Sequence, residues 1–193
     1  MKARILTLII AAFVGIGSLG AQNRWALKTN LLHDATASVN LALEYGFSPH
    51  WSAEVSASVN MWDLPDQLRL KHAIVQPELR YWLCDRFGGW FFDAHVIGGY
   101  TPGVGGFWDF SQYYHKFPNL KTFLLKDAIM LGMGGGVGYD VVLSRHWNLE
   151  FELGLGYMYV RGDEFWNDTL VLKASEFDYL GPTRLGLTIS YIF

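Results

Sequence analysis

The sequence predicts an all-β protein: an eight-stranded antiparallel up-and-down transmembrane β-barrel, preceded by a cleaved signal peptide. Three observations lead to this fold class. One stretch alternates between apolar and polar residues for longer than a soluble strand usually does, tryptophan opens every second predicted strand, and the N-terminus has the residue order of an export signal.

The alternation is clearest in residues 147–160. From Trp147 to Tyr159 the odd positions are all apolar or aromatic, whereas the even positions are mostly polar or glycine. A period of two gives a strand two chemically different faces. A half-buried strand of a soluble protein looks similar over about five or six residues, but a tilted membrane strand needs about 9–11, with aromatic residues at both interfaces. The length therefore favours an outer-membrane barrel.

The N-terminus predicts export. Lys2 and Arg4 precede the apolar run Ile5–Leu19, which ends in small residues, and this is the order of a secretory signal peptide. A transmembrane helix is the alternative, but the run is too short and is interrupted by glycine. We expect residues 1–21 to be the signal peptide and residues 22–193 to be the barrel domain, located in the bacterial outer membrane.

Composition agrees with a single membrane-facing domain. The chain has 193 residues, of which 51% are hydrophobic, 16% aromatic and 17% charged. It is rich in aromatic residues and poor in charge for a soluble domain. The formal charge of −3 gives no electrostatic case for nucleic-acid binding.

The predicted strands are residues 25–33, 36–46, 51–61, 72–83, 90–100, 128–142, 147–160 and 179–193. The connections after the second, fourth and sixth strands are short, and loops are predicted at residues 63–70, 101–125 and 161–178. Short turns at one end and mostly long loops at the other are typical of outer-membrane barrels. Pro77 lies within the fourth strand, where it removes a ladder donor, so we expect a bulge or weakened pairing there.

Aromatic residues mark the strand ends. A tryptophan opens the first, third, fifth and seventh predicted strands, and a soluble sandwich has no reason for this regularity, whereas a membrane interface does. The predicted aromatic girdle consists of Trp25, Trp51, Trp90, Trp147, Tyr191 and Phe193.

The opposite strand faces carry charge. The predicted interior network consists of Lys28, Glu44, Glu54, Glu78, Arg80, Asp93, His95, Asp140, Glu150, Glu152 and Arg184. Eight strands enclose a space that side chains can just fill, and buried charges must pair or become neutral. We interpret the set as a plug of ion pairs; a gated path for ions or protons is the alternative. Acids outnumber Lys and Arg, so one or two carboxylates would be protonated or hydrated.

Four segments resemble a known family: Trp25–Asp34 (WALKTNLLHD), Gln76–Trp82 (QPELRYW), His146–Glu150 (HWNLE) and Gly181–Thr183 (GPT). In combination they are similar to domain-of-unknown-function family 3575 of gut and oral Bacteroidetes, over nearly the whole mature chain. The resemblance implies a small outer-membrane barrel of the OmpA/OmpX type, an association of some members with fimbrial genes, and no established reaction. The C-terminal aromatic resembles the signal read by the barrel-assembly machinery, which makes that machinery an expected partner.

A structural or surface-interaction role is the functional prediction. Loop 101–125 concentrates exposed aromatic residues, which mark binding to a surface protein or a glycan; the candidates are Phe107, Trp108, Phe110, Tyr113 and Tyr114. The same rings could instead pack on one another as a continuation of the strands. Loop 161–178 is the second candidate for fimbrial association, adhesion or ligand binding.

Catalysis is the alternative function. A lipid-modifying enzyme would draw on His33, His72, Ser111 or His115, but neither G-x-S-x-G nor H-E-x-x-H occurs. We therefore predict no enzyme, no cofactor and no metal. A small gated channel is the other alternative. The expected partners are outer-membrane lipid and lipopolysaccharide, the assembly machinery, and a surface protein or glycan, with no nucleic acid.

Overall fold

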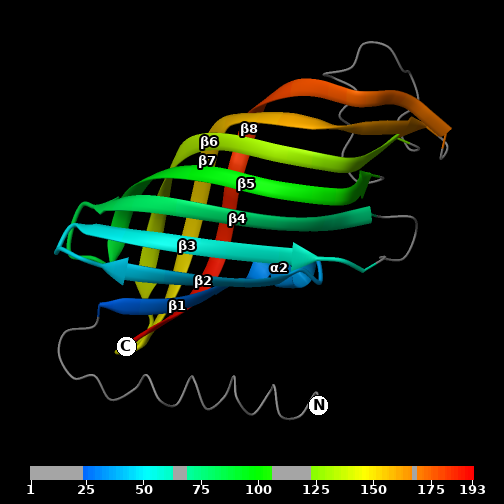
Figure 1. Cartoon of the computed structure of the whole chain (residues 1–193). Helices are drawn as coiled ribbons and strands as arrows, with labels where there is room; N and C mark the ends of the chain where they lie inside the picture. The colour runs from blue at the N-terminus through cyan, green and yellow to red at the C-terminus, as the bar shows by residue number, and fades with distance from the viewer. Residues whose placement is uncertain (1–23, 63–68, 106–122, 167–168) are drawn as a thin grey trace.

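The computed structural model describes residues 24–62, 69–105, 123–166 and 169–193. Within them, eight antiparallel strands follow one another in sequence order around a single sheet that closes on itself (Figure 1). The elements are β1 (Trp25–Asn30), α2 (Leu31–Ala35), β2 (Val39–Gly46), β3 (Trp51–Asn60), β4 (Arg69–Trp82), β5 (Gly89–Gly105), β6 (Phe123–Val142), β7 (Trp147–Trp166) and β8 (Thr169–Ile192). The predicted all-β class and antiparallel order are thereby confirmed.

The ring closes between the first and last strands. β1 pairs with β8 from Ala26 opposite Ile192 to Asn30 opposite Thr188. The backbones of Trp25 and Phe193 exchange two further hydrogen bonds, at 3.2 Å and 2.9 Å. No helix in the described part of the chain is long and apolar enough to cross a membrane.

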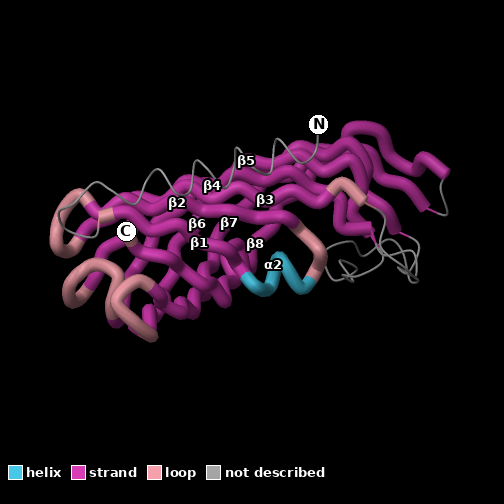
Figure 2. Tube along the Cα trace, turned by 90° about the horizontal axis from the view of Figure 1, so that it is seen from below, coloured by secondary structure: helices cyan, strands magenta, loops and turns pink. Residues whose placement is uncertain are grey.

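The short turns and the helix lie at opposite ends of the sheet (Figure 2). β1 was expected to run to residue 33 but ends at Asn30, because the Asn30 side chain accepts a hydrogen bond from the Leu32 backbone N–H (3.0 Å) and caps α2. Asparagine at this position is a strong helix start. The helix was not among the elements predicted from the sequence.

The long loops expected at residues 101–125 and 161–178 are partly wrong. β5 continues to Gly105 and β6 begins at Phe123, while β7 and β8 pair up to Trp166 opposite Thr169. These extensions are stabilised by an apolar cluster of Leu125, Ala128 and Val160, with Met130, Met158 and Phe177 packed against it. Register shifts at Lys126/Ile129 and Gly162/Glu164 interrupt the alternation, which explains why the period of two was not recognised there.

Pro77 produces no bulge. Val55 lies opposite Pro77 in a continuous register between β3 and β4. On the other side, the pairing with β5 skips residues 76 and 77 and resumes in the same register at Glu78 opposite His95. The missing N–H therefore weakens the pairing locally, as expected, without shifting it.

Two of the short turns are built alike. In each, a serine hydroxyl accepts a hydrogen bond from the backbone N–H of the tryptophan three residues later: Ser48 from Trp51 at 3.0 Å and Ser144 from Trp147 at 3.3 Å. In each, the histidine before that tryptophan also contacts the last residue of the neighbouring strand. His50 Nδ1 lies 3.0 Å from the Trp82 carbonyl oxygen, and His146 Nδ1 lies 2.9 Å from that of Ile192. The repeated Ser-x-His-Trp sequence is thus a device that joins each turn to the next strand.

Candidate functional site

The interior of the sheet is polar and its outside is apolar. On β3, Ser52, Glu54 and Asn60 are buried, whereas Val55 and Val59 between them are exposed. β7 repeats the pattern, with Glu150 and Glu152 buried inside a strand whose odd positions face outward. This is the reverse of a soluble protein. The candidate site is therefore the charged interior.

Glutamates form a continuous row inside the sheet. Glu44, Glu54 and Glu78 are cross-strand neighbours on β2, β3 and β4. Like charges directly opposite one another are unfavourable, so the row requires cations. Two of these are completely buried, Lys28 from β1 and Arg80 from β4.

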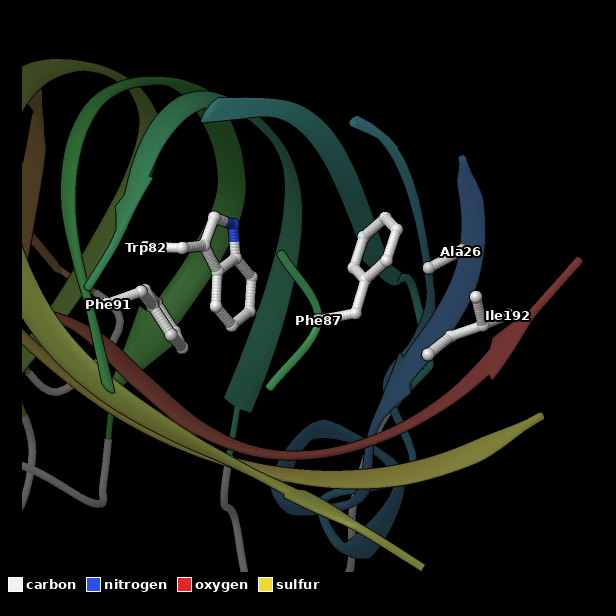
Figure 3. Packing of buried hydrophobic residues seen from close by; sticks show 5 residues of the cluster. All are labelled: Ala26, Trp82, Phe87, Phe91 and Ile192. Atoms are coloured by element: carbon white, nitrogen blue, oxygen red, sulfur yellow. The ribbon is translucent and has the colours of Figure 1, made fainter. Parts of the chain in front are cut away.

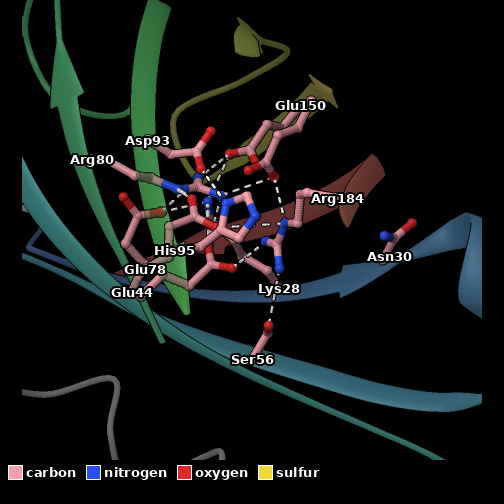
Figure 4. Close-up of polar contacts among 12 residues, drawn as sticks. Lys28, Asn30, Glu44, Ser56, Glu78, Arg80, Asp93, His95, Glu150 and Arg184 are labelled. Carbon is pink, nitrogen blue, oxygen red and sulfur yellow. Dashed lines mark hydrogen bonds and ion pairs between the residues drawn. The ribbon is translucent and has the colours of Figure 1, made fainter. Parts of the chain in front are cut away.

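Arg80 is the centre of the network (Figure 4). Its Nη1 lies 2.8 Å from Glu150 and 3.3 Å from Glu44, and its Nη2 lies 3.1 Å from both Glu152 and Glu54. Its Nε also pairs with Glu78. One planar guanidinium thus joins carboxylates from β2, β3, β4 and β7, a geometry that lysine cannot reproduce.

Lys28 and Arg184 complete the network from the two sides. Lys28 Nζ lies 2.7 Å from Glu150 and 3.1 Å from Glu54, and it also pairs with Glu44. Arg184 Nη2 lies 2.6 Å from Glu54, and its Nε lies 2.9 Å from Glu152. Apart from Asp93, His95 and Asp140, the predicted charges are thus brought together from six strands, β1–β4, β7 and β8.

Asp93 and His95 form a pair beside the network. His95 Nδ1 lies 2.6 Å from Asp93 Oδ1, and its Nε2 lies 2.8 Å from Thr183 Oγ1. An ionised carboxylate only accepts, so in the neutral imidazole Nδ1 donates to Asp93 and Nε2 accepts from the Thr183 hydroxyl.

A β-bulge places Thr183. Gly154 lies opposite Arg184 and Leu155 opposite Pro182, so Thr183 is the extra residue of β8. Bulges re-aim side chains, and here Thr183 and Arg184 both reach interior partners although they are adjacent in sequence. Thr183 was part of a recognised sequence motif but not of the predicted network, and only the preceding proline indicated an irregular strand.

Glycines provide the space for this arrangement. A Cβ on Gly134 of β6 would lie 2.5 Å from His95 Nε2 and 2.7 Å from Thr183 Oγ1, and a Cβ on Gly154 of β7 would lie 2.8 Å from His95 Cε1. The imidazole of β5 therefore reaches β8 only because β6 and β7 carry no side chains there.

The order carboxylate, imidazole and hydroxyl is also that of a catalytic triad. Thr183 and Arg184 line a cavity of about 70 Å³ on the α2 side of the network. This volume is far below the roughly 300–1,000 Å³ of ordinary ligand pockets. The arrangement can hold a proton or a small ion, but a lipid chain does not fit.

The expected catalytic histidines lie elsewhere. His33 Nδ1 and His72 Nε2 lie 3.0 Å and 2.9 Å from the same Ser58 hydroxyl. Burial, followed by the neighbouring His72, lowers the pKa of His33 on α2. Ser111 and His115 lie outside the described residues, as do the loop candidates Phe107, Trp108, Phe110, Tyr113 and Tyr114.

The short-turn end of the interior is closed by an apolar cluster (Figure 3). Trp82 and Phe91 pack with ring centroids 4.7 Å apart, and Ala26 and Ile192 belong to the same buried set. Phe87 enters from the β4–β5 turn, with a left-handed φ of 63°. An open hollow of about 730 Å³ lies outside this cluster. This apolar cluster was not predicted from the sequence, because Phe87, which completes it, lies in a turn.

The predicted girdle residues lie at this same end of the sheet, and each tryptophan pairs with a tyrosine opposite it on the next strand. The centroid distances are 4.5 Å for Trp25–Tyr45, 5.0 Å for Trp51–Tyr81, 5.0 Å for Trp90–Tyr139 and 5.1 Å for Trp147–Tyr191. Phe193 stacks on Tyr191 at 6.3 Å. The tyrosine partners Tyr45, Tyr81 and Tyr139 were not part of the predicted girdle.

Comparison with known proteins gives a family but no activity. No curated protein matches the chain. The family described as protein of unknown function (DUF3575) matches residues 5–193. Since the match covers nearly the whole sequence, the chain belongs to the protein family of unknown function DUF3575.

Proposed function

We propose that the chain is an integral outer-membrane β-barrel whose interior is closed by ion pairs and whose role is structural or is an interaction at the cell surface. The observation that carries this proposal is the inverted distribution of residues. Large apolar side chains are exposed around the whole sheet, including Leu43, Val55, Leu79, Val96, Leu131, Leu153 and Leu185, while the charges lie inside. A water-exposed surface does not tolerate so large an apolar band, whereas lipid requires it.

The aromatic pairs support the same reading. Trp and Tyr gather at membrane interfaces, where one end of the ring is apolar and the other is wet. The four Trp–Tyr pairs form such a belt at the short-turn end, which would be the periplasmic side. Export by residues 1–21 would bring the chain to the outer membrane.

Membrane fractionation tests this location. The protein should remain in the outer-membrane fraction after a carbonate wash, because its apolar band needs lipid, and it should migrate faster on a gel when unboiled than when boiled, because closed barrels resist detergent at room temperature. Release as a soluble protein that migrates identically under both conditions would rule out the membrane proposal.

The surface role would belong to the end opposite the short turns. There β5–β8 extend beyond β1–β3 (Figure 1), and the segment 106–122 connects the two long strands β5 and β6. Loops on a rigid scaffold can vary without disturbing the ladder, so binding is commonly placed there. We propose that this extended rim presents the binding residues to a surface protein or glycan.

Replacement of residues 106–122 by a short Asn-Gly linker tests the surface role. The variant should keep its heat-modifiable migration, because β5 and β6 pair up to Gly105 opposite Leu124, and it should lose adhesion, fimbrial assembly or glycan capture. An unchanged surface phenotype would leave only the structural role.

A separate experiment tests the enzymatic alternative. Lipopolysaccharide and phospholipid incubated with the purified protein should stay chemically unchanged by mass spectrometry. A product that disappears on His33→Ala or His115→Ala would instead establish the enzymatic alternative.

A further inference from the structure

The interior of the sheet has fewer permanent cations than acids. Among the described residues, three permanent cations, Lys28, Arg80 and Arg184, face seven carboxylates: Glu44, Glu54, Glu78, Asp93, Asp140, Glu150 and Glu152. Buried carboxylates must be neutralised by protons or by cations. A bound positive ion would therefore neutralise part of this excess negative charge.

One group at the edge of the network has the composition of a metal site. Glu78, Asp93 and His95 each offer a ligand atom, and these three atoms lie within 4.8 Å of one another. Glu78 and His95 are opposite each other on β4 and β5, and Asp93 lies two residues before His95 on the same face. Three ligands on two adjacent paired strands are held in place by the backbone ladder.

Two oxygens of this group have no hydrogen-bond partner among the described residues. They are Asp93 Oδ2 and Glu78 Oε2, and the side chains that carry them are only 8% and 5% exposed. Glu78 Oε2 lies 3.5 Å from Arg184 Nε, beyond a normal charge-assisted hydrogen bond. A buried, unpartnered carboxylate oxygen is costly, and a cation at this position would remove that cost.

The surrounding residues make room for the group. A Cβ on Gly136 would lie 2.1 Å from Asp93 Oδ2, and one on Gly134 would lie 2.5 Å from His95 Nε2. Thr183 adds a neutral oxygen 2.8 Å from the same ring nitrogen. The cavity of about 70 Å³ that Thr183 lines would give a small ion a route to the site.

We propose that Glu78, Asp93 and His95 bind one divalent transition-metal ion inside the barrel. One imidazole with two carboxylates suits Zn²⁺ or Mn²⁺, whereas Ca²⁺ and Mg²⁺ prefer all-oxygen sites. Binding requires His95 to give up one of its two hydrogen bonds. The ion would link β4 to β5 and offset part of the negative charge that Arg80 and Arg184 leave uncompensated.

The proposal is tested by titrating chelator-stripped, folded protein with Zn²⁺ and measuring the binding by isothermal titration calorimetry. A second titration with Co²⁺ is monitored by visible absorption. We expect one ion per wild-type chain, and binding weaker by at least about tenfold in both His95→Gln and Asp93→Asn. The Co²⁺ spectrum should lose its ligand-field bands in the same variants. Far-ultraviolet circular dichroism, compared with that of the wild type, checks that each variant has folded.

His33→Gln is the matched control, because His33 lies on α2 among other polar residues but outside the group, and its binding should equal that of the wild type. Failure of folded wild type to bind Zn²⁺ would overturn the proposal and leave protons to neutralise the carboxylates. Equal affinity in His95→Gln and the wild type would also overturn it, as would an equal loss in His33→Gln. Since the titration needs only folded protein, its outcome is separable from that of the membrane fractionation.

Discussion

Replacement of Arg80 by alanine should destabilise the protein by at least about 3–5 kcal/mol, the range for breaking a buried ion pair. The expected loss is large because one completely buried guanidinium pairs with Glu44, Glu54, Glu78, Glu150 and Glu152. Without it, these carboxylates repel one another at short range. Urea titration in detergent micelles, followed by tryptophan fluorescence, measures the change in the free energy of unfolding.

Arg161→Ala is the matched control. Arg161 pairs with Glu176 at 3.5 Å, but the two side chains are 58% and 52% exposed, so the loss should stay within about 1 kcal/mol. Planar-bilayer recordings test whether the interior is closed. The wild type and Arg161→Ala should both show little or no steady conductance. A loss below about 1 kcal/mol in Arg80→Ala, or a large open channel in the wild type, would contradict the role of Arg80 as the centre of a plug.

Addition of one methyl group at Gly138 should cost about 1–3 kcal/mol through overpacking. A Cβ there would lie 2.2 Å from Phe91 Cζ and 2.8 Å from the Phe151 carbonyl oxygen. Phe91 cannot swing away, because its ring packs against Trp82 at 4.7 Å and under the Arg80 guanidinium at 4.5 Å. The same urea titration of Gly138→Ala measures the loss.

Gly98→Ala provides the comparison. Gly98 lies on the outward face of the neighbouring strand β5, and a Cβ there meets nothing within 4 Å. Its stability should stay within about 0.5 kcal/mol of the wild type. If the two alanine variants lose equal stability, the glycines of β6 act through backbone conformation and not through space for the interior layer.

The all-β class, the antiparallel strand order and the sorting of residues into two faces could be predicted from the sequence. The sorting is a local property, because side chains alternate along a strand regardless of what it pairs with. The pattern of residues 147–160 alone therefore predicts that Leu153 and Glu152 lie on opposite faces. The tryptophans at strand starts were visible for the same reason. Except for Arg184, which follows the bulge on β8, the charges assigned to the interior lie in stretches of strand whose alternation is regular.

Which of these charges meet depends on how the sheet closes. Arg80 joins carboxylates on four strands because closure of the sheet brings β7 across from β3 and β4, a contact that no short-range pattern encodes. The extension of β7 and β8 was hidden by register shifts, and α2 begins where a single side chain, that of Asn30, caps it. Thr183 reaches His95 through a bulge on β8 and glycines on β6 and β7. The contact between Thr183 and His95 thus depends on four strands at once, so no short-range sequence pattern predicts it.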